Sequence, residues 1–568
     1  MRSVTHNPVH GNGSMGGIGD GVATTHCERS VTISCVPRPD LPDTDRPRVD
    51  GVDLRDARMW RGLRTALVRA GYTVDGVTAL LGSAARAALD RGETTPARRA
   101  VRGAGVAGTL VRLFLLGDGL PRAEVAAALE PVDVDEAVAY GLLAADGDQL
   151  RAALDLRPHA DAAVPDAPPW WVLSDLEVAP GGDVAEQSST MRRGRTADRE
   201  HVLGTGAASL SLARATVRRP VATLLDVGTG CGVQVLHASG HAASCTATDV
   251  STRALEMARV TFALSGLDVE CLAGPWLEPV AGRRFDQIVS NPPFVPGPPR
   301  VEHVYRDAGL GGDGASALLV GRLPAHLTEG GTAQLLASWL ITSDDWTERP
   351  RAWLEEAAAA AAPGGLDAWV VQRDVADPAL HVGTWLRDAG VDPASEEGTT
   401  VSERWLDWLE GAGVHAVGFG FVTLRRTAPD VAGTVVCEDL RQAHDDPLGP
   451  EIEAWLDRTA RLAGRDDDTL LDERLLVPDT VALERGLVST DEGWSSVAAT
   501  LVRLDGPQWR HDVDELGVAL LAGCRGHLPL RDLLDLLALA HGRDAAELAR
   551  TAVPVVRDLV RHGMLVWR

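Results

Sequence analysis

Two turns rich in glycine or proline, each directly after an apolar run, constrain this chain more than any other feature. The first is Asp226-Val-Gly-Thr-Gly-Cys-Gly232 and the second is Asn291-Pro-Pro-Phe294. Around them, strand-like and helix-like segments alternate from 201 to about 428, which predicts an α/β domain with a mainly parallel sheet. The pair of turns, in this order, is far more specific than either turn alone.

The pattern of the chain also predicts where the elements of this domain lie. Ser251 follows the second apolar run and is a suitable N-cap for a helix over 251–264. An alanine-rich helix is expected over 355–362. The expected strands are 221–227, 244–249, 284–290, 331–339, 368–374 and 414–425, the last of which closes the sheet.

The flanks differ in composition from this central domain. Residues 1–50 are rich in Gly, Pro, Ser and Thr and are expected to be disordered. The segment 51–158 predicts a helical, winged-helix-like domain, with helices over 74–81, 109–116, 122–129 and 134–140 and a strand–turn–strand over 141–154. A linker or covering loop is expected over 159–200. Residues 429–568 predict a mainly helical domain that ends in a helix over 553–562 and a strand over 563–567, like half of another winged helix.

Charge and cysteine content exclude some classes of protein. The 568 residues carry a net charge of -25, and the sequence contains no lysine, so all 55 basic side chains are arginines. This acidity disfavours broad, nonspecific binding of nucleic acid, although a local basic groove remains compatible with it. Seven scattered cysteines without a C-x-x-C pair argue against a disulfide framework or a zinc site. With no signal-peptide core and no membrane span, a soluble, cytoplasmic protein without metal or membrane partner is expected.

The first turn has the glycine spacing of a ligand loop. Gly228, Gly230 and Gly232 allow the backbone to turn tightly and to approach a ligand closely. The D-x-G-x-G-x-G spacing suits the methionine end of S-adenosylmethionine better than a pyrophosphate. Asp249, at the end of the second strand, can accept hydrogen bonds from both ribose hydroxyls. The alternatives are a glycine turn without a ligand and an Asp249 that only caps the next helix.

The second turn suits chemistry on a planar nitrogen. An amide or aromatic amine is a poor nucleophile because its lone pair is delocalised. The side-chain oxygen of Asn291 and the carbonyl of Pro292 could both accept hydrogen bonds from a substrate NH2 group, while Pro292 and Pro293 stiffen the turn. Phe294 offers a flat face to a planar substrate, or packs in the core. No metal and no strong base is needed, because the leaving thioether is neutral.

These residues carry a resemblance to a known family. The chain resembles the class I S-adenosylmethionine-dependent methyltransferases with an N-P-P-[FY] motif, also described as small-domain methyltransferases. Asn291-Pro-Pro-Phe-Val-Pro-Gly-Pro-Pro299, followed by Gly311-Gly-Asp-Gly314, looks most like the release-factor glutamine N5-methyltransferases. The resemblance covers 200–345 well and reaches about 428 loosely. It implies a Rossmann-like, seven-stranded domain with Asp249 on the ribose and Asn291 on the substrate amide.

The chain departs from that family at several positions. Phe294 replaces a tyrosine, and phenylalanine is as common in enzymes that methylate guanine or adenine amino groups. Many relatives hold the adenine amino group with an acid where this chain has Ala273-Gly-Pro-Trp276, so Trp276 stacks on adenine instead or simply packs. The segment His201-Val-Leu-Gly-Thr-Gly206 is a possible lid over the methionine moiety. Tyr305, Arg306 and Asp307 either line the substrate entry or form a surface loop.

The sequence therefore predicts an N-methyltransferase that acts on an amide or amine nitrogen. A glutamine of a release-factor-type protein is the first expected substrate, and a nucleobase amine of structured rRNA, tRNA or DNA is the second. A non-catalytic regulator that binds S-adenosylmethionine is a further alternative. The expected catalytic residues are Asn291, Pro292, Pro293 and Phe294. The expected cofactor-binding residues are Asp226, Gly228, Thr229, Gly230, Gly232, Asp249, Val250, Trp276 and Asn291.

Overall fold

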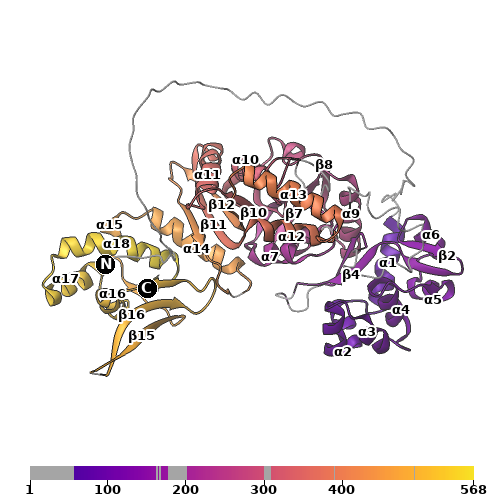
Figure 1. Ribbon diagram of the computed structural model, residues 1–568, viewed down its shortest axis with the longest axis horizontal. Coiled ribbons are helices and arrows are strands. Elements are labelled where there is room, and N and C mark those ends of the chain that lie inside the picture. Colours follow the sequence, from indigo (N-terminus) through magenta and orange to yellow (C-terminus); the bar gives the residue numbers. More distant parts are fainter. Residues whose placement is uncertain are drawn as a thin grey trace, which may run out of the picture.

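The computed structural model describes residues 57–161, 164, 168–176, 201–299, 309–388, 391–444, 446–491 and 493–568. The predictions for 1–50 and for Tyr305, Arg306 and Asp307 lie outside these residues. In Figure 1 the α/β domain lies between the N-terminal domain, drawn in indigo, and the C-terminal domain, drawn in yellow. No helix in the described part of the chain is both long enough and apolar enough to cross a membrane.

An eight-stranded sheet forms the centre of the molecule, in the order β13-β11-β12-β10-β9-β6-β7-β8. β6 pairs in parallel with both β7 and β9, whereas β12 runs antiparallel to β10 and β11. The α/β prediction is confirmed. The strands are β6 Val221–Val227, β7 Ala242–Asp249, β8 Glu270–Ala273, β9 Phe285–Ser290, β10 Leu327–Ile341, β11 Gly364–Ala376, β12 Ala416–Pro429 and β13 Val435–Asp439.

β13 is the strand that the sequence does not predict. It pairs in parallel with β11 and adds an eighth strand to the seven expected. The sheet therefore continues beyond residue 428, where the sequence predicts that the domain ends. β12 also lies between β10 and β11 and does not close the sheet. A strand of five residues after a glycine-containing turn has too little alternation to stand out in the sequence.

Alternating side chains divide the sheet into two apolar faces. Leu335 and Ala337 of β10 belong to the cluster with α10 (Gly314–Arg322) and α11 (Glu348–Ala361). Leu336, on the opposite face, packs with residues of α7 (Ala207–Ala215) and α14 (Gly449–Ala463). This period of two is the geometry of a strand that is buried on both faces. The same layer as α7 contains the short helix α8 (Val233–Ala238) and α9 (Thr252–Ser265), which pack on β6, β7 and β9.

The N-terminal domain contains the predicted helix–turn–helix and hairpin. Helices α5 and α6 are followed by β2 and β3, and the small sheet has the order β1-β3-β2. The helix expected over 109–116 is divided into an α-helix and a π-helical turn, η1. The elements are α1 Ala57–Arg69, α2 Val74–Asp90, α3 Thr94–Ala100, α4 Gly105–Leu110, η1 Val111–Leu115, β1 Leu120–Pro121, α5 Arg122–Leu129, α6 Val134–Ala139, β2 Leu143–Asp146 and β3 Gln149–Ala152.

The sequence predicts a linker or covering loop over 159–200, but one stretch of it forms a strand. Trp170–Ser174 forms strand β5, which pairs antiparallel with β4 (Asp155–His159). The buried Trp171 donates from Nε1 to the carbonyl of Tyr72 at 2.7 Å, and the Leu173 amide donates to Thr261 Oγ1 of α9 at 3.1 Å. This strand therefore joins the N-terminal domain to α9. The run Trp-Trp-Val-Leu is strand-forming, but the prolines directly before it suggest a loop.

Between β11 and β12 the chain inserts two helices that the sequence does not predict. They are α12 (Pro378–Asp388) and α13 (Glu396–Gly411). Trp385 of α12 and Trp405 of α13 lie 4.2 Å apart between ring centroids, in an apolar cluster that includes Leu340 of β10. Because β11 is parallel to β9 and β10, this insertion leaves the sheet at the edge where those strands end.

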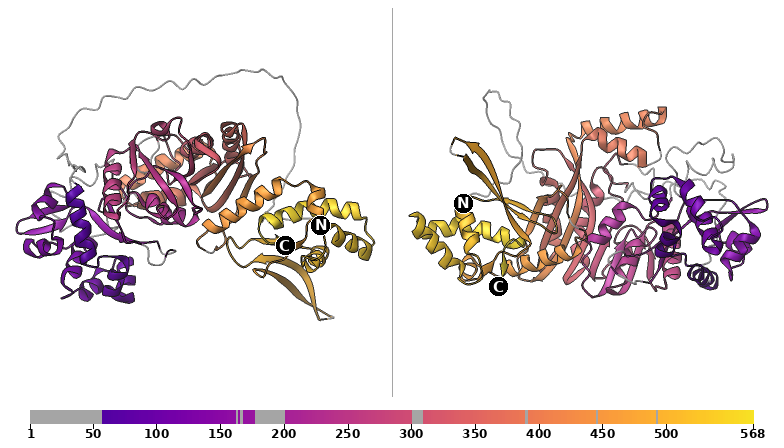
Figure 2. Two further views of the ribbon diagram at one scale, coloured as in Figure 1. Left: turned by 180° about the vertical axis from the view of Figure 1, so that it is seen from behind. Right: turned by 90° about the horizontal axis from the view of Figure 1, so that it is seen from below.

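The prediction of a mainly helical C-terminal domain omits a three-stranded sheet. That sheet has the order β15-β16-β17, and its first two strands form a long hairpin (Figure 2). The predicted final helix and strand are present as α18 and β18, and β18 pairs with β14. The elements after α14 are α15 Asp467–Leu471, β14 Leu475–Leu476, β15 Val481–Thr490, β16 Gly493–Arg503, β17 Arg510–Asp512, α16 Glu515–Gly523, α17 Leu530–His541, α18 Ala545–Arg561 and β18 Val566–Trp567.

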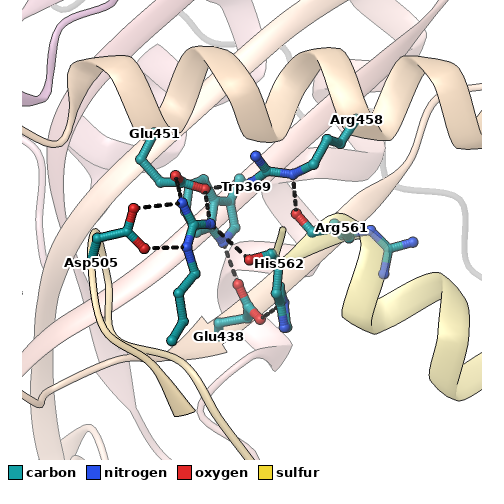
Figure 3. Close-up of polar contacts among 8 residues, drawn as sticks. Trp369, Glu438, Glu451, Arg458, Asp505, Arg561 and His562 are labelled. Carbon is teal, nitrogen blue, oxygen red and sulfur yellow. Dashed lines mark hydrogen bonds and ion pairs between the residues drawn. The ribbon is translucent and has the colours of Figure 1, made fainter. Parts of the chain in front are cut away.

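Stacked tryptophans and buried charges hold the C-terminal domain on the sheet. Trp369 of β11 stacks on Trp455 of α14, with 4.7 Å between ring centroids and 8° between planes. Figure 3 shows polar contacts in the region of Trp369. Glu451 of α14 is only 8% exposed and accepts hydrogen bonds from Arg458 and from Arg503 of β16. Glu438 of β13 pairs with His562 at 2.6 Å.

Replacing Glu451 tests whether this network stabilises the domain. Glu451→Ala leaves Arg458 and Arg503 buried around a missing acceptor, which costs about 3–5 kcal/mol in typical buried pairs. We expect a large fall in the melting temperature, measured by calorimetry. Asp468→Ala is the matched control, because the Asp468–Arg531 pair is exposed. It should leave the melting temperature almost unchanged, because an exposed ion pair contributes little to stability. Equal effects of the two substitutions would contradict the assignment.

Candidate active site

A cavity of about 520 Å3 opens at the carboxyl ends of β6, β7 and β9. It brings together most of the residues that the two sequence motifs single out. Predicted site residues that line it are Gly228, Thr229, Gly230, Asp249, Val250, Trp276, Asn291, Pro292 and Pro293. His201–Gly206, the predicted lid segment, contributes His201, Val202, Leu203, Gly204 and Gly206 to the same wall. Whether that segment closes over a ligand stays a prediction.

The glycine loop after β6 takes the left-handed backbone conformation that glycine permits. The φ angles of Gly228, Gly230 and Gly232 are 74°, 56° and 90°. A Cβ on Gly232 would lie 2.6 Å from the ring of Phe262 in α9. Gly232 itself does not line the cavity, so its part in the site is to let the loop pass close to α9. The expectation that it contacts a cofactor is not supported by this position.

Asp249 connects the glycine loop to the end of β7. Its carboxylate accepts hydrogen bonds from the amides of Gly230 and Ser251, both at 2.9 Å. Burial raises its pKa, although these hydrogen bonds oppose the shift. The N-cap of α9 is Ser251, whose side chain accepts from Ala254 N. The alternative in which Asp249 is that cap is therefore wrong, and the carboxylate lies at the cavity wall where a ribose role is predicted.

Asp226 lies beneath the glycine loop and not in the cavity. Its side chain is fully buried, and Oδ2 accepts a hydrogen bond from Thr229 Oγ1 at 2.7 Å. Oδ1 is buried without a hydrogen-bond partner in the described structure. Burial raises the pKa of Asp226 to about 7. Asp226 does not line the cavity, so its side chain supports the loop through Thr229, and a contact with the cofactor stays a prediction.

The side chain of Asn291 is oriented by a residue that the sequence does not reveal. Nδ2 of Asn291 donates to Ser209 Oγ of α7 at 3.0 Å, which leaves Oδ1 to accept hydrogen bonds. Gln234 in turn donates to the Ser209 carbonyl at 2.8 Å. Both Ser209 and Gln234 line the cavity. Ser209 is 82 positions from Asn291 and belongs to no local motif, so no sequence signal could have found it.

The rest of the Asn291 loop is fixed from three other elements. The Ser338 hydroxyl of β10 donates to the Phe294 carbonyl, and Nε2 of the buried His381 of α12 donates to the Pro296 carbonyl at 2.8 Å. Gly297 lies against Trp405 of α13, where a Cβ would be 2.3 Å from the ring. Gly312 of the Gly311–Gly314 segment donates to the Gly297 carbonyl at 2.9 Å. The α12–α13 insertion therefore holds the loop that carries Asn291.

Phe294 does not offer its ring to the cavity. The side chain is half-buried and packs against the apolar cluster shared by the sheet and the C-terminal domain. The cavity wall ends at Pro293 of this motif. This packing agrees with the core alternative, and the stacking of Phe294 on a substrate stays a prediction.

The cavity has the properties that S-adenosylmethionine requires. The left-handed glycine turn exposes backbone at one wall, and the Asp249 carboxylate and the Trp276 side chain lie at others. Trp276 adopts a φ of 51° and also packs against the buried cluster that contains Leu277 and Val280. Among the described residues, no group of three or more His, Cys, Asp or Glu could hold a metal ion.

The sheet order and the glycine loop define a class I methyltransferase fold. A family model described as methyltransferase small domain matches residues 206–307. Two further models, each described as a domain of unknown function, match 69–153 and 453–567. The match to the small domain contains both motifs, whereas the other two coincide with the flanking domains.

Curated relatives agree with that family. A release factor glutamine methyltransferase of Deinococcus radiodurans is 34% identical over 191 residues, which are 28% of this chain and 68% of the relative. The release factor glutamine methyltransferase of Bordetella pertussis is 35% identical over 159 residues, which are 24% of this chain and 54% of the relative. A ribosomal RNA small subunit methyltransferase C of Salmonella choleraesuis is 38% identical over 117 residues, 20% of this chain and 31% of the relative. The chain thus spans about two thirds, about half and about a third of these relatives.

One of the solved structures that resemble this chain is a 16S rRNA methyltransferase of T. thermophilus in complex with AdoMet and guanosine. It is 18% identical, with 48% of this chain and 66% of that chain covered and a TM-score of 0.23. The chain belongs to the methyltransferases that contain the methyltransferase small domain. It is an S-adenosylmethionine-dependent enzyme.

The buried Asp226 predicts a dependence of stability on pH. A carboxyl whose pKa is raised on folding stabilises the protein below its ordinary pKa, and this contribution is lost as the pH rises through about 7. Asp226→Asn keeps the acceptor for Thr229 and removes the charge. We expect the variant to gain about 2 kcal/mol relative to the parent between pH 5 and pH 8, seen as a growing difference in melting temperature. A difference that stays constant with pH would contradict the assignment.

Proposed function

We propose that this enzyme transfers a methyl group to a planar amide nitrogen, and that the acceptor is a glutamine side chain of a protein. The observation that carries the proposal is the orientation of Asn291. Ser209 accepts a hydrogen bond from the NH2 group of this side chain. The side-chain oxygen of Asn291 therefore remains to accept a hydrogen bond from a substrate at the cavity wall. An acceptor held there can orient a substrate NH2 group.

The residues of the chain account for the chemistry by positioning. S-adenosylmethionine supplies an electrophilic methyl group on a sulfonium centre, with a neutral thioether as the leaving group. Asn291 Oδ1 and the Pro292 carbonyl accept hydrogen bonds from the substrate NH2 group and turn its lone pair toward the methyl group. The proton that the product nitrogen loses passes to solvent. Hydrogen bonds from Ser338 and His381 to the carbonyls of Phe294 and Pro296 hold the loop that carries these acceptors, so that little reorganisation is needed during the reaction.

Two observations support a protein substrate. The relatives named release factor glutamine methyltransferase match over more of their length than the rRNA relative does. The net charge of -25 also opposes the approach of a phosphate backbone. A nucleobase amine in rRNA is the second candidate, because the Salmonella relative is the most similar of these three in percentage identity.

Substitutions at Asn291 and Ser209 test the positioning scheme. Asn291→Ala should lower kcat by about 100-fold or more, because the substrate acceptor is lost. Ser209→Ala should lower kcat less, since Asn291 remains but can rotate. S-adenosylmethionine affinity, measured by calorimetry, should stay within a few-fold for both variants.

Conservative replacement separates positioning from a structural effect. Ser209→Thr keeps the hydroxyl and should recover most of the activity that Ser209→Ala loses. A comparable loss of cofactor binding in Asn291→Ala would instead place that side chain on the cofactor. An unchanged kcat would remove it from the reaction.

Labelled S-adenosylmethionine identifies the acceptor class. The purified enzyme is incubated with a cell lysate, and the Asn291→Ala variant serves as the background. We expect label that protease treatment removes and nuclease treatment leaves, with methylglutamine in the protein hydrolysate. Label that is lost only with nuclease would overturn the glutamine proposal in favour of the nucleobase.

A further inference from the structure

The β15–β16 hairpin extends from the C-terminal domain as a two-stranded ribbon (Figures 1 and 2). β17 covers only its base, because it pairs with Thr500, Leu501 and Val502 alone. All described residues of Gly493–Ala498 are exposed, as are those of β15 from Leu483 onward. A two-stranded hairpin without a covering layer is only marginally stable in water, so a bare ribbon of this length is unusual.

One face of the exposed ribbon carries its largest apolar side chains. Leu483 and Leu487 lie on the same face of β15 because they are four residues apart. Trp494 pairs with Ser489, which places its ring on that face too. The three side chains are 40%, 52% and 74% exposed. Exposed apolar patches of this kind, above all with a tryptophan, mark surfaces that bind a partner.

The charge of the domain decides between the possible partners. Residues 429–568 contain 26 acidic side chains and 15 arginines, and the exposed Asp491 lies at the turn of the hairpin. This field repels a phosphate backbone and also a second copy of the same acidic domain. It attracts a protein with an excess of Arg and Lys. Arg485 lies between the two leucines on the same face. Its guanidinium can donate hydrogen bonds to a carbonyl or carboxylate of that protein.

We propose that the β15–β16 hairpin is a docking arm for a basic protein, whose apolar patch covers Leu483, Leu487 and Trp494. β15 is an edge strand, so its outer backbone groups are also open to pairing with an extended segment of the partner. This surface is separate from the cavity, whose described lining lies between His201 and Pro293. Binding at the hairpin therefore stands whether or not the acceptor of the methyl group is a glutamine.

Photo-crosslinking of the full chain in cells tests the proposal. A photoreactive amino acid replaces Trp494 in one version and Leu539 in the control, because Leu539 of α17 is 83% exposed and outside the hairpin. We expect an adduct from position 494 alone, in which mass spectrometry identifies a protein rich in Arg and Lys. An adduct with a second copy of this chain, with nucleic acid, or with equal yield from both positions would overturn the proposal, as would the absence of any adduct.

The identified protein is then purified and its affinity for the full chain is measured. Trp494→Ser should weaken binding by about tenfold or more, and Leu539→Ser should leave it unchanged. Raising the salt concentration should weaken binding further, because the attraction is partly electrostatic. The circular dichroism and the melting temperature of Trp494→Ser show whether the domain stays folded. Unchanged affinity in a folded Trp494→Ser variant would overturn the proposal.

Discussion

The parallel pairing of β6 with both β7 and β9 is the constraint on which the site depends. The chain leaves β6 toward β7 on one side and later returns to β9 on the other, so the order of the sheet reverses at β6. Ligands bind outside the carboxyl ends of the strands at such a switch point. The glycine loop, Asp249 and Asn291 each follow one of these three strands. The fold alone therefore brings together residues from three separate parts of the sequence.

Rigidity at this edge comes from hydrogen bonds between elements and not from the proline turn alone. The Asn291 loop is held by Ser209 from α7, by Ser338 from β10 and by His381 from α12. These bonds pair the Asn291 side-chain amide and the carbonyls of Phe294 and Pro296, and a buried polar group left without a partner is costly. The α12–α13 insertion is part of this support, because Gly297 fits against Trp405 only without a side chain. The insertion thereby links substrate positioning to a segment that is distant in sequence.

The sequence predicts local features well and long-range features poorly. The strand 221–227, the helix after Ser251 and the helices 122–129 and 134–140 follow from periodicity and capping, which are local properties. The side-chain directions of Asp226 and Phe294 depend on which layer covers the loop, and local sequence patterns do not determine them. Ser209 and the α12–α13 insertion have no motif, because their roles arise from contacts with residues far along the chain.

The described residues that line the cavity come from one segment of this chain. Every described residue that lines the cavity lies between His201 and Pro293, inside the segment matched by the small domain or directly before it. The N-terminal domain contacts α9 through Arg64 and β5, and the C-terminal domain covers the face of β11 through Trp455. Neither flank contributes a described side chain to the cavity. The acidic charge is confined to one of the two flanks, because residues 51–158 contain 14 acidic side chains and 14 arginines, whereas residues 429–568 contain 26 and 15. The charge of the C-terminal domain therefore disfavours contact with nucleic acid, and that of the N-terminal domain does not.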